Sequence, residues 1–360
     1  MHNAVLSQCK VGEKELKRWL YASLILVLTL FSCSEPRPTK QITPGIYHWK
    51  STYNPTDSLL HTSEELGICK QYIRFFDVDN TAQNHTAAPV SVVKFQQKPQ
   101  VTVVPVIYIT NRTLIKKPKA DIDALAKKVW SKTQQIAIEN DIDIKEIQLD
   151  CDWTQGTQQN YFRFIEKLNH YSGDSLILTS TIRLHQIKFR EKTGVPPVNR
   201  GVLMLYNVGD WTNIDTENSL FDPEVIDEYI DRASSYPIAL DIALPIYNQT
   251  VVYRNDVFFS YLKNSSPKAI NNHINLQKTE KQNFYECTDD CTLGNTDFRK
   301  GDIFRHESVD FEELNQIKQA LLNRIRNRQI NILFYHLDER SFDNFTYNEF
   351  KKLLRDENNA

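Results

Sequence analysis

Short apolar runs alternate with longer amphipathic segments along most of this chain. Brief runs rich in branched and aromatic residues predict strands. They lie at 45–53, 72–78, 101–110, 145–154, 175–183, 201–207, 237–247 and 330–338. The longer amphipathic segments predict helices at 63–70, 120–139, 158–171, 223–234, 310–328 and 347–355.

Strands that alternate with helices predict parallel pairing through right-handed crossovers. About eight such units over about 300 residues have the size and strand count of a closed barrel. The expected fold class is therefore α/β, a (β/α)8 TIM barrel over residues 45–355. Residues 249–307 are polar and irregular, which indicates an insertion between strands seven and eight. An open doubly wound sheet is the alternative, and the missing phosphate-binding turn weakens it.

The stretch 145–154, KEIQLDCDWT, places two carboxylates at the end of an apolar strand. Side chains alternate between the faces of a strand, so Asp150 and Asp152 share one face with Gln148. Two neighbouring carboxylates are costly to bury without partners. A helix cap would explain one of them but not both. The pair therefore indicates a polar mouth at the carboxyl end of the barrel.

Other polar side chains also follow the expected strands. A barrel would bring these carboxyl-terminal residues to one mouth, although each alone has an ordinary explanation as a cap or loop residue. The set is Asp77, Asp79, Asp150, Asp152, Arg183, His185, Tyr206, Asn207, Tyr247, His336, Asp338 and Glu339. Trp49, Trp153 and Trp211 lie near them in the sequence. Carboxylates accept hydrogen bonds from hydroxyls and indoles stack on sugar rings, so the predicted cleft suits a glycan.

Composition and charge narrow the range of partners. The chain has 360 residues, is 41% hydrophobic and carries a net charge of -2, so no basic stripe predicts nucleic-acid binding. No GxGxxG or Walker sequence occurs, and no cofactor is expected. His185 and His336 lie on separate strands without the close spacing of a zinc helix, so no metal site is expected. Cys287 and Cys291 form either a local disulfide or two free thiols.

Residues 1–33 read as a targeting segment. Basic residues precede an apolar run at 19–31 that is too short for a comfortable membrane span. The run ends in LFSC, which resembles the lipobox of bacterial lipoproteins. That resemblance implies cleavage before Cys33, lipid attachment to its thiol and, with Ser34 rather than Asp next, the outer membrane. Residues 34–44 read as a tether. An ordinary signal anchor with an incidental cysteine is the alternative.

Four separated segments carry a family resemblance. They are IQLDCDWT at 147–154, LMLYN at 203–207, IALPIYN at 242–248 and ILFYHLDE at 332–339. The first is similar to the fourth-strand signature DxxDxDxE of the chitinase-type glycoside hydrolases (family 18). The next two are similar to the MxYD and GxPxYG motifs of that family, and the last resembles its eighth strand. The order of the four segments covers the whole expected barrel.

The resemblance implies site residues but also departs from the family pattern. Asp150 and Asp152 match two carboxylates of the signature, and Tyr206 matches the tyrosine that supports the oxazolinium intermediate. The catalytic acid of the family is a Glu at the position of Thr154, and Asn207 replaces the Asp of the sixth strand. A threonine hydroxyl does not ionise usefully near neutral pH, so the family mechanism lacks its proton donor.

The sequence therefore favours a carbohydrate-active envelope lipoprotein, of glycoside hydrolase type, with a glycan as its partner and a lipid anchor at Cys33. The expected catalytic residues are Asp150, Asp152, Tyr206 and Glu339, because paired carboxylates are usual in glycoside hydrolysis. The expected substrate-binding residues are Asp77, Asp79, Trp153, Arg183, His185, Asn207, Tyr247, His336 and Asp338. The alternative is a glycan-binding lipoprotein without catalysis, on a degenerate chitinase-like barrel.

Overall fold

The computed structural model describes residues 39–357 except 82–85, 174–175, 264 and 266. The expected targeting segment and Cys33 lie outside the described residues. Within the described part, every helix is too short or too polar to cross a membrane.

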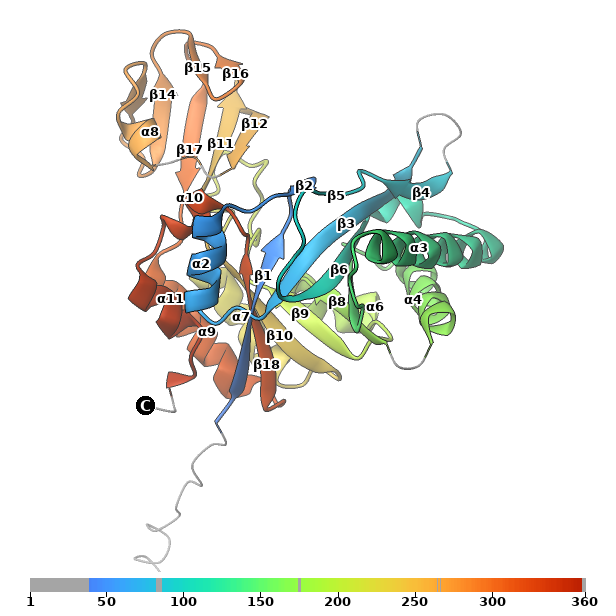
Figure 1. The fold of residues 1–360 in the computed structure, drawn as a ribbon. Helices are drawn as coiled ribbons and strands as arrows, with labels where there is room; N and C mark the ends of the chain where they lie inside the picture. Colours follow the sequence, from blue (N-terminus) through green and yellow to red (C-terminus); the bar gives the residue numbers. More distant parts are fainter. Residues whose placement is uncertain (1–38, 82–85, 174–175, 264, 266, 358–360) are drawn as a thin grey trace, which may run out of the picture. The chain divides into compact units, whose positions relative to one another are not determined.

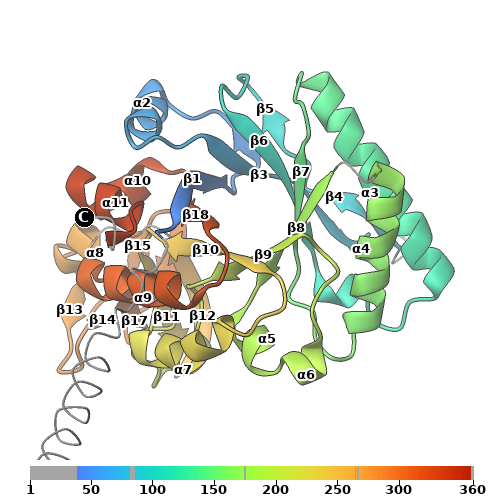
Figure 2. The same cartoon turned by 90° about the horizontal axis from the view of Figure 1, so that it is seen from below.

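Parallel strands close into a barrel, which confirms the predicted (β/α)8 fold class. In sequence order they are β1 (Gln41–His48), β3 (Lys70–Asn80), β6 (Thr102–Ile109), β7 (Glu146–Asp150), β8 (Ile177–Ile182), β9 (Arg200–Met204), β10 (Ala239–Pro245) and β18 (Gln329–Tyr335). The ring closes because β1 pairs in parallel with both β18 and β3. Figure 2 shows this ring with helices outside it. The first strand begins at Gln41, within the segment expected to be a tether.

The outer helices follow the predicted pattern after most strands. They are α2 (Asp57–Glu65), α3 (Lys119–Glu139), α4 (Gln158–Ser172), α5 (Leu184–Lys188), α6 (Arg190–Thr193), α7 (Pro223–Ala233), α9 (Phe311–Arg324), α10 (Glu339–Phe342) and α11 (Tyr347–Leu353). The longest, α3, buries Ile122, Leu125 and Val129 at helical spacing. Helix α2 starts earlier than expected because Thr56 caps it by accepting a hydrogen bond from the backbone N–H of Leu59.

The second crossover departs from the helical rhythm. After β3 the chain forms β4 (Ala87–Val90), which pairs antiparallel with β3, and then β5 (Lys94–Phe95). Strand β5 pairs with β2 (Thr52–Tyr53). A 3-10 turn, η1 (Asn111–Thr113), follows β6. This part of the sequence has only a weak apolar pattern, which is why no helix was expected there.

The inner face of β7 is polar. Glu146 accepts hydrogen bonds from the Tyr72 hydroxyl and from Lys70, each at 3.1 Å, and Gln148 accepts one from the Tyr47 hydroxyl at 2.7 Å. Tyr72 and Tyr47 belong to β3 and β1, which are not neighbours of β7 in the ring, so these contacts cross the barrel interior. The alternation of side chains along β7 continues to Asp150 at the carboxyl end of the strand.

The insertion between β10 and α9 is an ordered sheet rather than an irregular loop (Figure 1). Its five antiparallel strands have the order β12-β11-β17-β14-β13. Their bounds are β11 (Gln249–Arg254), β12 (Val257–Lys263), β13 (Leu276–Lys278), β14 (Phe284–Cys287) and β17 (Ile303–Glu307). Helix α8 (Pro267–Asn271) and the hairpin of β15 (Cys291–Leu293) with β16 (Thr296–Phe298) complete it.

A buried ion pair ties the insertion to the barrel. Arg305 donates to Glu307 at 2.7 Å, and neither side chain is exposed. Glu307 also accepts hydrogen bonds from the backbone N–H and hydroxyl of Ser219, in the loop after β9. Arg305 donates to the carbonyl of Thr216 in the same loop at 2.7 Å. The desolvated charges are therefore paired, which fixes the insertion against the β9 loop.

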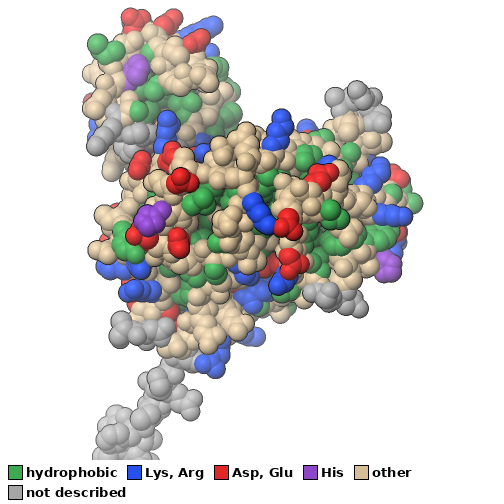
Figure 3. Space-filling view, viewed as in Figure 1, with side chains coloured by type: hydrophobic (Ala, Val, Ile, Leu, Met, Phe, Trp, Pro, Cys, Tyr) green, Lys and Arg blue, Asp and Glu red, His purple; other side chains and the backbone are tan. Residues whose placement is uncertain are grey.

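Charged side chains of both signs are interspersed over the face seen in Figure 3. No broad patch of one sign forms among the described residues of that face. The mixture agrees with the small net charge of the chain.

Candidate functional site

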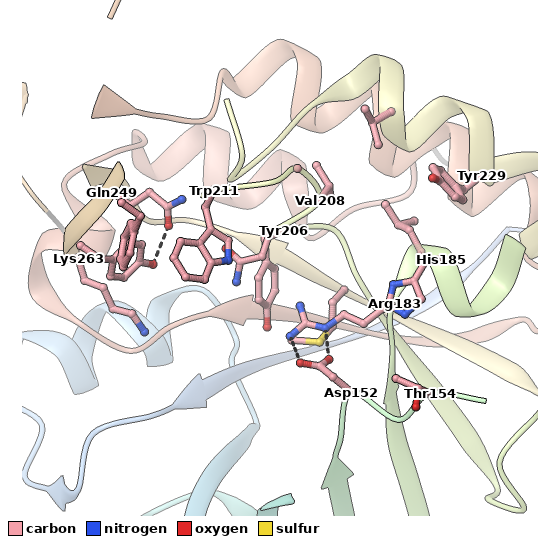
Figure 4. Close-up of a pocket in the computed structure, with 17 residues that line it drawn as sticks. Asp152, Thr154, Arg183, His185, Tyr206, Val208, Trp211, Tyr229, Gln249 and Lys263 are labelled. Atoms are coloured by element: carbon pink, nitrogen blue, oxygen red, sulfur yellow. Dashed lines mark hydrogen bonds and ion pairs between the residues drawn. The ribbon is translucent and has the colours of Figure 1, made fainter. Parts of the chain in front are cut away.

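A pocket of about 720 Å³ lies at the carboxyl end of the barrel, between the strand ends and the insertion. Its walls come from the segments after β7, β8 and β9 and from strands β11 and β12 (Figure 4). The lining residues are Asp152, Thr154, Arg183, Leu184, His185, Met204, Tyr206, Asn207, Val208, Gly209, Trp211, Val225, Tyr229, Gln249, Phe258, Tyr261 and Lys263. Several residues predicted from strand ends are thus brought together here.

Asp152 is held by Arg183. The Arg183 Nε donates to Asp152 Oδ1 at 2.6 Å and its Nη2 donates to Oδ2 at 3.4 Å (Figure 4). Burial opposes the charge of Arg183, but the carboxylates of Asp152 and Asp150 raise its pKa above the usual range. The guanidinium therefore stays charged and pairs with the Asp152 carboxyl group.

Asp150 lies beneath this pair and does not line the pocket. Its carboxyl is buried and accepts a hydrogen bond from the Thr181 hydroxyl at 2.7 Å. Burial, and then the charge of Asp152, raise the pKa of Asp150 to about 6, while Arg183 and Thr181 oppose the rise. One carboxyl of the pair therefore takes up a proton in mildly acidic solution.

Thr154 occupies the position where the family resemblance would place the catalytic acid. Its side chain lines the pocket, and its backbone N–H donates to the Thr157 hydroxyl at 3.0 Å. Among the described residues that line the pocket, Asp152 is the only carboxylate, and it is paired with Arg183. The pocket therefore contains no unpaired carboxylic acid next to Thr154 that could protonate a leaving group.

Three aromatic side chains pack together at the ends of β9, β10 and β18. The rings of Tyr206 and Tyr335 lie 4.9 Å apart, and those of Tyr247 and Tyr335 lie 5.4 Å apart. The Tyr247 hydroxyl donates to Asn207 at 3.3 Å. The buried hydroxyl of Tyr206 has no hydrogen-bond partner within the described chain, and burial raises its pKa. Tyr206 is therefore a neutral donor beside the pocket.

The two tryptophans near the site have different roles. Trp211 is 43% exposed, lines the pocket and meets Phe258 edge-on at 4.4 Å. Trp153 is fully buried, stacks on Tyr161 at 5.1 Å and donates to the Thr193 carbonyl at 2.8 Å. The structure therefore makes Trp153 a core residue instead of the expected substrate-binding one, because the alternation that turns Asp152 inward turns Trp153 outward.

The two acidic residues at the end of β3 do not line this pocket. Asp77 pairs with Arg74 at 3.3 Å, and burial raises its pKa, while its charge still acts on Asp150. Asp79 accepts hydrogen bonds from Arg112 at 2.7 Å and from Thr110 at 2.9 Å. These bonds lower the pKa of Asp79 to about 2. Asp77 is therefore near the mouth, and Asp79 is engaged by the segment after β6.

The residues after β18 divide between two places. His336 is buried, its Nδ1 has no partner in the described chain, and burial lowers its pKa to about 4. Asp338 pairs with Lys50 and caps α10 by accepting from the Arg340 N–H at 3.1 Å. Glu339 accepts a hydrogen bond from Thr56 at 2.7 Å, in a separate crevice beside α2. Glu339 is therefore not positioned as the partner carboxylate that was expected.

His185 lines the pocket, and burial lowers its pKa, so it is neutral near pH 7. Within the described residues, no group of three or more histidine, cysteine, aspartate or glutamate side chains is arranged to hold a metal ion. Sequence reasoning missed four pocket residues from the insertion, Gln249, Phe258, Tyr261 and Lys263. Their strands, QTVVYR at 249–254 and VFFSYLK at 257–263, are rich in branched and aromatic residues, and this composition is the signal that could have located them.

Solved structures share this fold at low sequence identity. The spore cortex-lytic enzyme SleL of Bacillus cereus aligns over 88% of this chain and 75% of its own, with 14% identity and a TM-score of 0.51. A chitinase from Chromobacterium violaceum aligns over 88% and 99%, with 10% identity and a TM-score of 0.55. The C-terminal domain of a putative chitinase from Desulfitobacterium hafniense aligns over 88% and 100%, with 11% identity and a TM-score of 0.54.

No protein-family model and no curated protein matches the sequence itself. Identities of 10–14% support a common fold without transferring an activity. The closed parallel barrel agrees with these structural neighbours. The chain has the TIM-barrel fold of the chitinase-type glycoside hydrolases.

Proposed function

We propose that this protein binds a glycan in the pocket at the barrel mouth and does not hydrolyse it by the chitinase mechanism. One observation carries the proposal: Thr154 stands where that mechanism has its proton donor, and Asp152, the single carboxylate among the described lining residues, is paired with Arg183. Substrate assistance requires a carboxylic acid within reach of the leaving oxygen. The pocket therefore keeps a lining that can bind a glycan but lacks the catalytic acid at position 154.

The lining suits a sugar because it combines a partly exposed aromatic face with fixed polar groups. Trp211 presents its indole to the pocket, and an indole stacks on the apolar face of a pyranose ring. Asn207 supplies an amide group that can both donate and accept hydrogen bonds, whereas the amide of Gln249 is already bonded to Glu307 and Tyr261. The structural neighbours include chitinases, so an N-acetylglucosamine oligomer is the first ligand to test.

Isothermal titration calorimetry with chitotetraose tests this assignment. We expect saturable binding and a loss of about tenfold in affinity in Trp211→Ala, because an aromatic stacking contact contributes on the order of 1 kcal/mol. Tyr347→Ala is the matched control, since Tyr347 is also a partly exposed aromatic (45%) but lies outside the pocket. Equal loss in both variants, or no binding by the wild type, would overturn the proposal.

A hydrolase is the second candidate, and the raised pKa of Asp150 favours it. A buried carboxyl with a pKa of about 6 beside a charged Asp152 resembles the split pair that glycosidases use. Release of reducing ends from chitotetraose at pH 5–6, abolished in both Asp150→Asn and Asp152→Asn, would support this candidate. Activity that survives in both variants would point to a contaminating enzyme.

The cellular setting is also a proposal. We infer from the sequence that the chain is an envelope lipoprotein anchored at Cys33 in the outer membrane, with the barrel carried by the segment that follows. Growth with an alkyne fatty acid should label the wild type and Cys9→Ala but not Cys33→Ala. Label that persists in Cys33→Ala would exclude this anchor.

A further inference from the structure

Lys263 brings a positive charge from the insertion to the mouth of the barrel. It is the last residue of β12 and lines the pocket opposite Arg183 and Asp152 (Figure 4). Its Nζ lies 5.9 Å from the ring centre of Tyr335, at the end of barrel strand β18, and 5.8 Å from that of Tyr261. At this distance an aromatic ring attracts a cation through a cation–π interaction, but it does not neutralise the charge.

No carboxylate of the described chain pairs with this ammonium. The insertion supplies acidic partners to its other inward cations: Asp302 accepts from Arg254 at 2.7 Å, and Glu307 accepts from Arg305 at 2.7 Å. The Lys263 ammonium instead lies near two aromatic rings, and its charge also acts on the buried His336. The insertion therefore leaves one cation unmatched where it faces the barrel.

The surrounding charges reinforce this imbalance. The charged residues that line the pocket are Lys263, Arg183 and Asp152, so the Arg183–Asp152 pair leaves the charge of Lys263 unmatched. Loss of solvent, and then the neighbouring Arg74, lower the pKa of Lys263. Arg74 is itself engaged by Asp77 at 3.3 Å. An anion that entered here would relieve repulsion between Lys263 and Arg74 as well as pair with the ammonium.

We infer that the pocket prefers a glycan that carries an anionic substituent, with Lys263 as the residue that binds the anion. This inference rests on the proposed glycan-binding function and names its ligand class more closely. A carboxylate or a sulfate ester on the sugar would provide the charge. An ammonium is a compact point charge with three donors, so it pairs with either group.

Three matched oligosaccharides test the inference by calorimetry at low ionic strength. They are chitotetraose, chitotetraose oxidised to the uronate at C6, and chitotetraose 6-O-sulfate. We expect at least one anionic ligand to bind about tenfold more tightly than the neutral one, as for a partly desolvated charged hydrogen bond. Added salt should reduce the preference. The two anionic ligands distinguish a carboxylate from a sulfate.

Variants assign the preference to one side chain. Lys263→Met should bring the neutral and anionic ligands to equal affinity, whereas Lys263→Arg should retain the preference. Lys145→Met is the matched control, because Lys145 precedes β7 at the opposite end of the barrel and its side chain is 78% exposed. Thermal unfolding should show that all three variants remain folded.

The outcomes separate this inference from the proposed function. Equal affinity of the wild type for all three ligands would overturn the anionic preference and leave glycan binding in place. A preference that persists in Lys263→Met would remove Lys263 as its cause and overturn the inference. If none of the three ligands bound, both the proposed function and the inference would fail.

Discussion

The Arg183 guanidinium, just after β8, donates two hydrogen bonds to the Asp152 carboxylate, just after β7, at 2.6 Å and 3.4 Å. This pair joins the ends of two neighbouring strands at the wall of the pocket. It also fixes the carboxylate as an acceptor, because both of its oxygens accept hydrogen bonds from the guanidinium. A carboxylate held in this way suits ligand orientation better than proton donation.

Breaking the Arg183–Asp152 pair should destabilise the fold modestly. We expect Arg183→Gln to lower the free energy of unfolding by about 1–2 kcal/mol, since Asp152 is about half exposed and water partly compensates the loss. Arg324→Gln, which removes a more exposed pair with Asp231, should cost less than about 1 kcal/mol. Urea denaturation measures both. A coupling energy near zero in the cycle with Asp152→Asn would contradict this role.

The raised pKa of Asp150 predicts a pH-dependent difference from Asp150→Asn. The ordinary pKa of this carboxyl is 3.8 and its pKa in the folded protein is about 6. Between these two pH values the folded protein binds more protons at Asp150 than the unfolded chain does. The contribution of Asp150 to stability is therefore lost as pH rises through this range. The free energy of unfolding of the wild type, relative to Asp150→Asn, should therefore fall by about 2–3 kcal/mol from pH 4 to pH 7.

Urea denaturation of both proteins at several pH values measures this difference. Burial lowers the pKa of His48 and His336 to about 4, which gives a trend of the opposite sign. Because both proteins contain these histidines, their effect cancels in the comparison. A difference that stays constant across the range would show that Asp150 is not perturbed.

Trp153 should matter for stability rather than for binding. We expect Trp153→Ala to lower the free energy of unfolding by about 3–5 kcal/mol, because it empties a buried site and removes the bond to Thr193. Trp211→Ala should change stability by less than about 1 kcal/mol, since its ring is partly exposed. Thermal unfolding compares the two, and similar losses would contradict the division of roles.

The alternation of apolar and polar residues was enough to place most of the barrel. The expected strands coincide with β1, β3, β6, β7, β8, β9, β10 and β18 because branched, apolar runs have few alternatives in a parallel sheet covered by helices. The segment after β3 could not be placed in this way, since its strands β4 and β5 are short and half-buried. Their position depends on pairing with distant strands.

The site was predictable only in part. Strand alternation indicated that Asp150 and Asp152 lie close together on one face. The same alternation places Trp153 on the opposite face, so it would have excluded Trp153 from the substrate-binding residues. Glu339 was misplaced because Asp338 caps a helix and turns the next side chain toward Thr56. Lys263 came from a segment read as irregular, and its approach to the barrel depends on tertiary contacts that no local pattern contains.

The two cysteines of the insertion should form a disulfide under oxidising conditions. The thiols of Cys287 and Cys291 lie 3.2 Å apart at the ends of β14 and β15. Each thiol would lose a proton and one electron to a disulfide reagent such as oxidised glutathione, which is reduced to two thiols. Mass spectrometry should show a loss of two hydrogens within one peptide. Two separately glutathionylated cysteines would contradict the prediction.

The most direct test of the central claim follows the indole N–H signals of the protein labelled with 15N-tryptophan. The sequence has five tryptophans, and single Trp→Phe variants assign their signals. Addition of chitotetraose, or of its more tightly bound anionic form, should shift the Trp211 signal and leave that of Trp153 in place, with the sugar intact after prolonged incubation. An unmoved Trp211 signal, or a shift that decays as the tetrasaccharide is shortened, would contradict glycan binding without hydrolysis at this pocket.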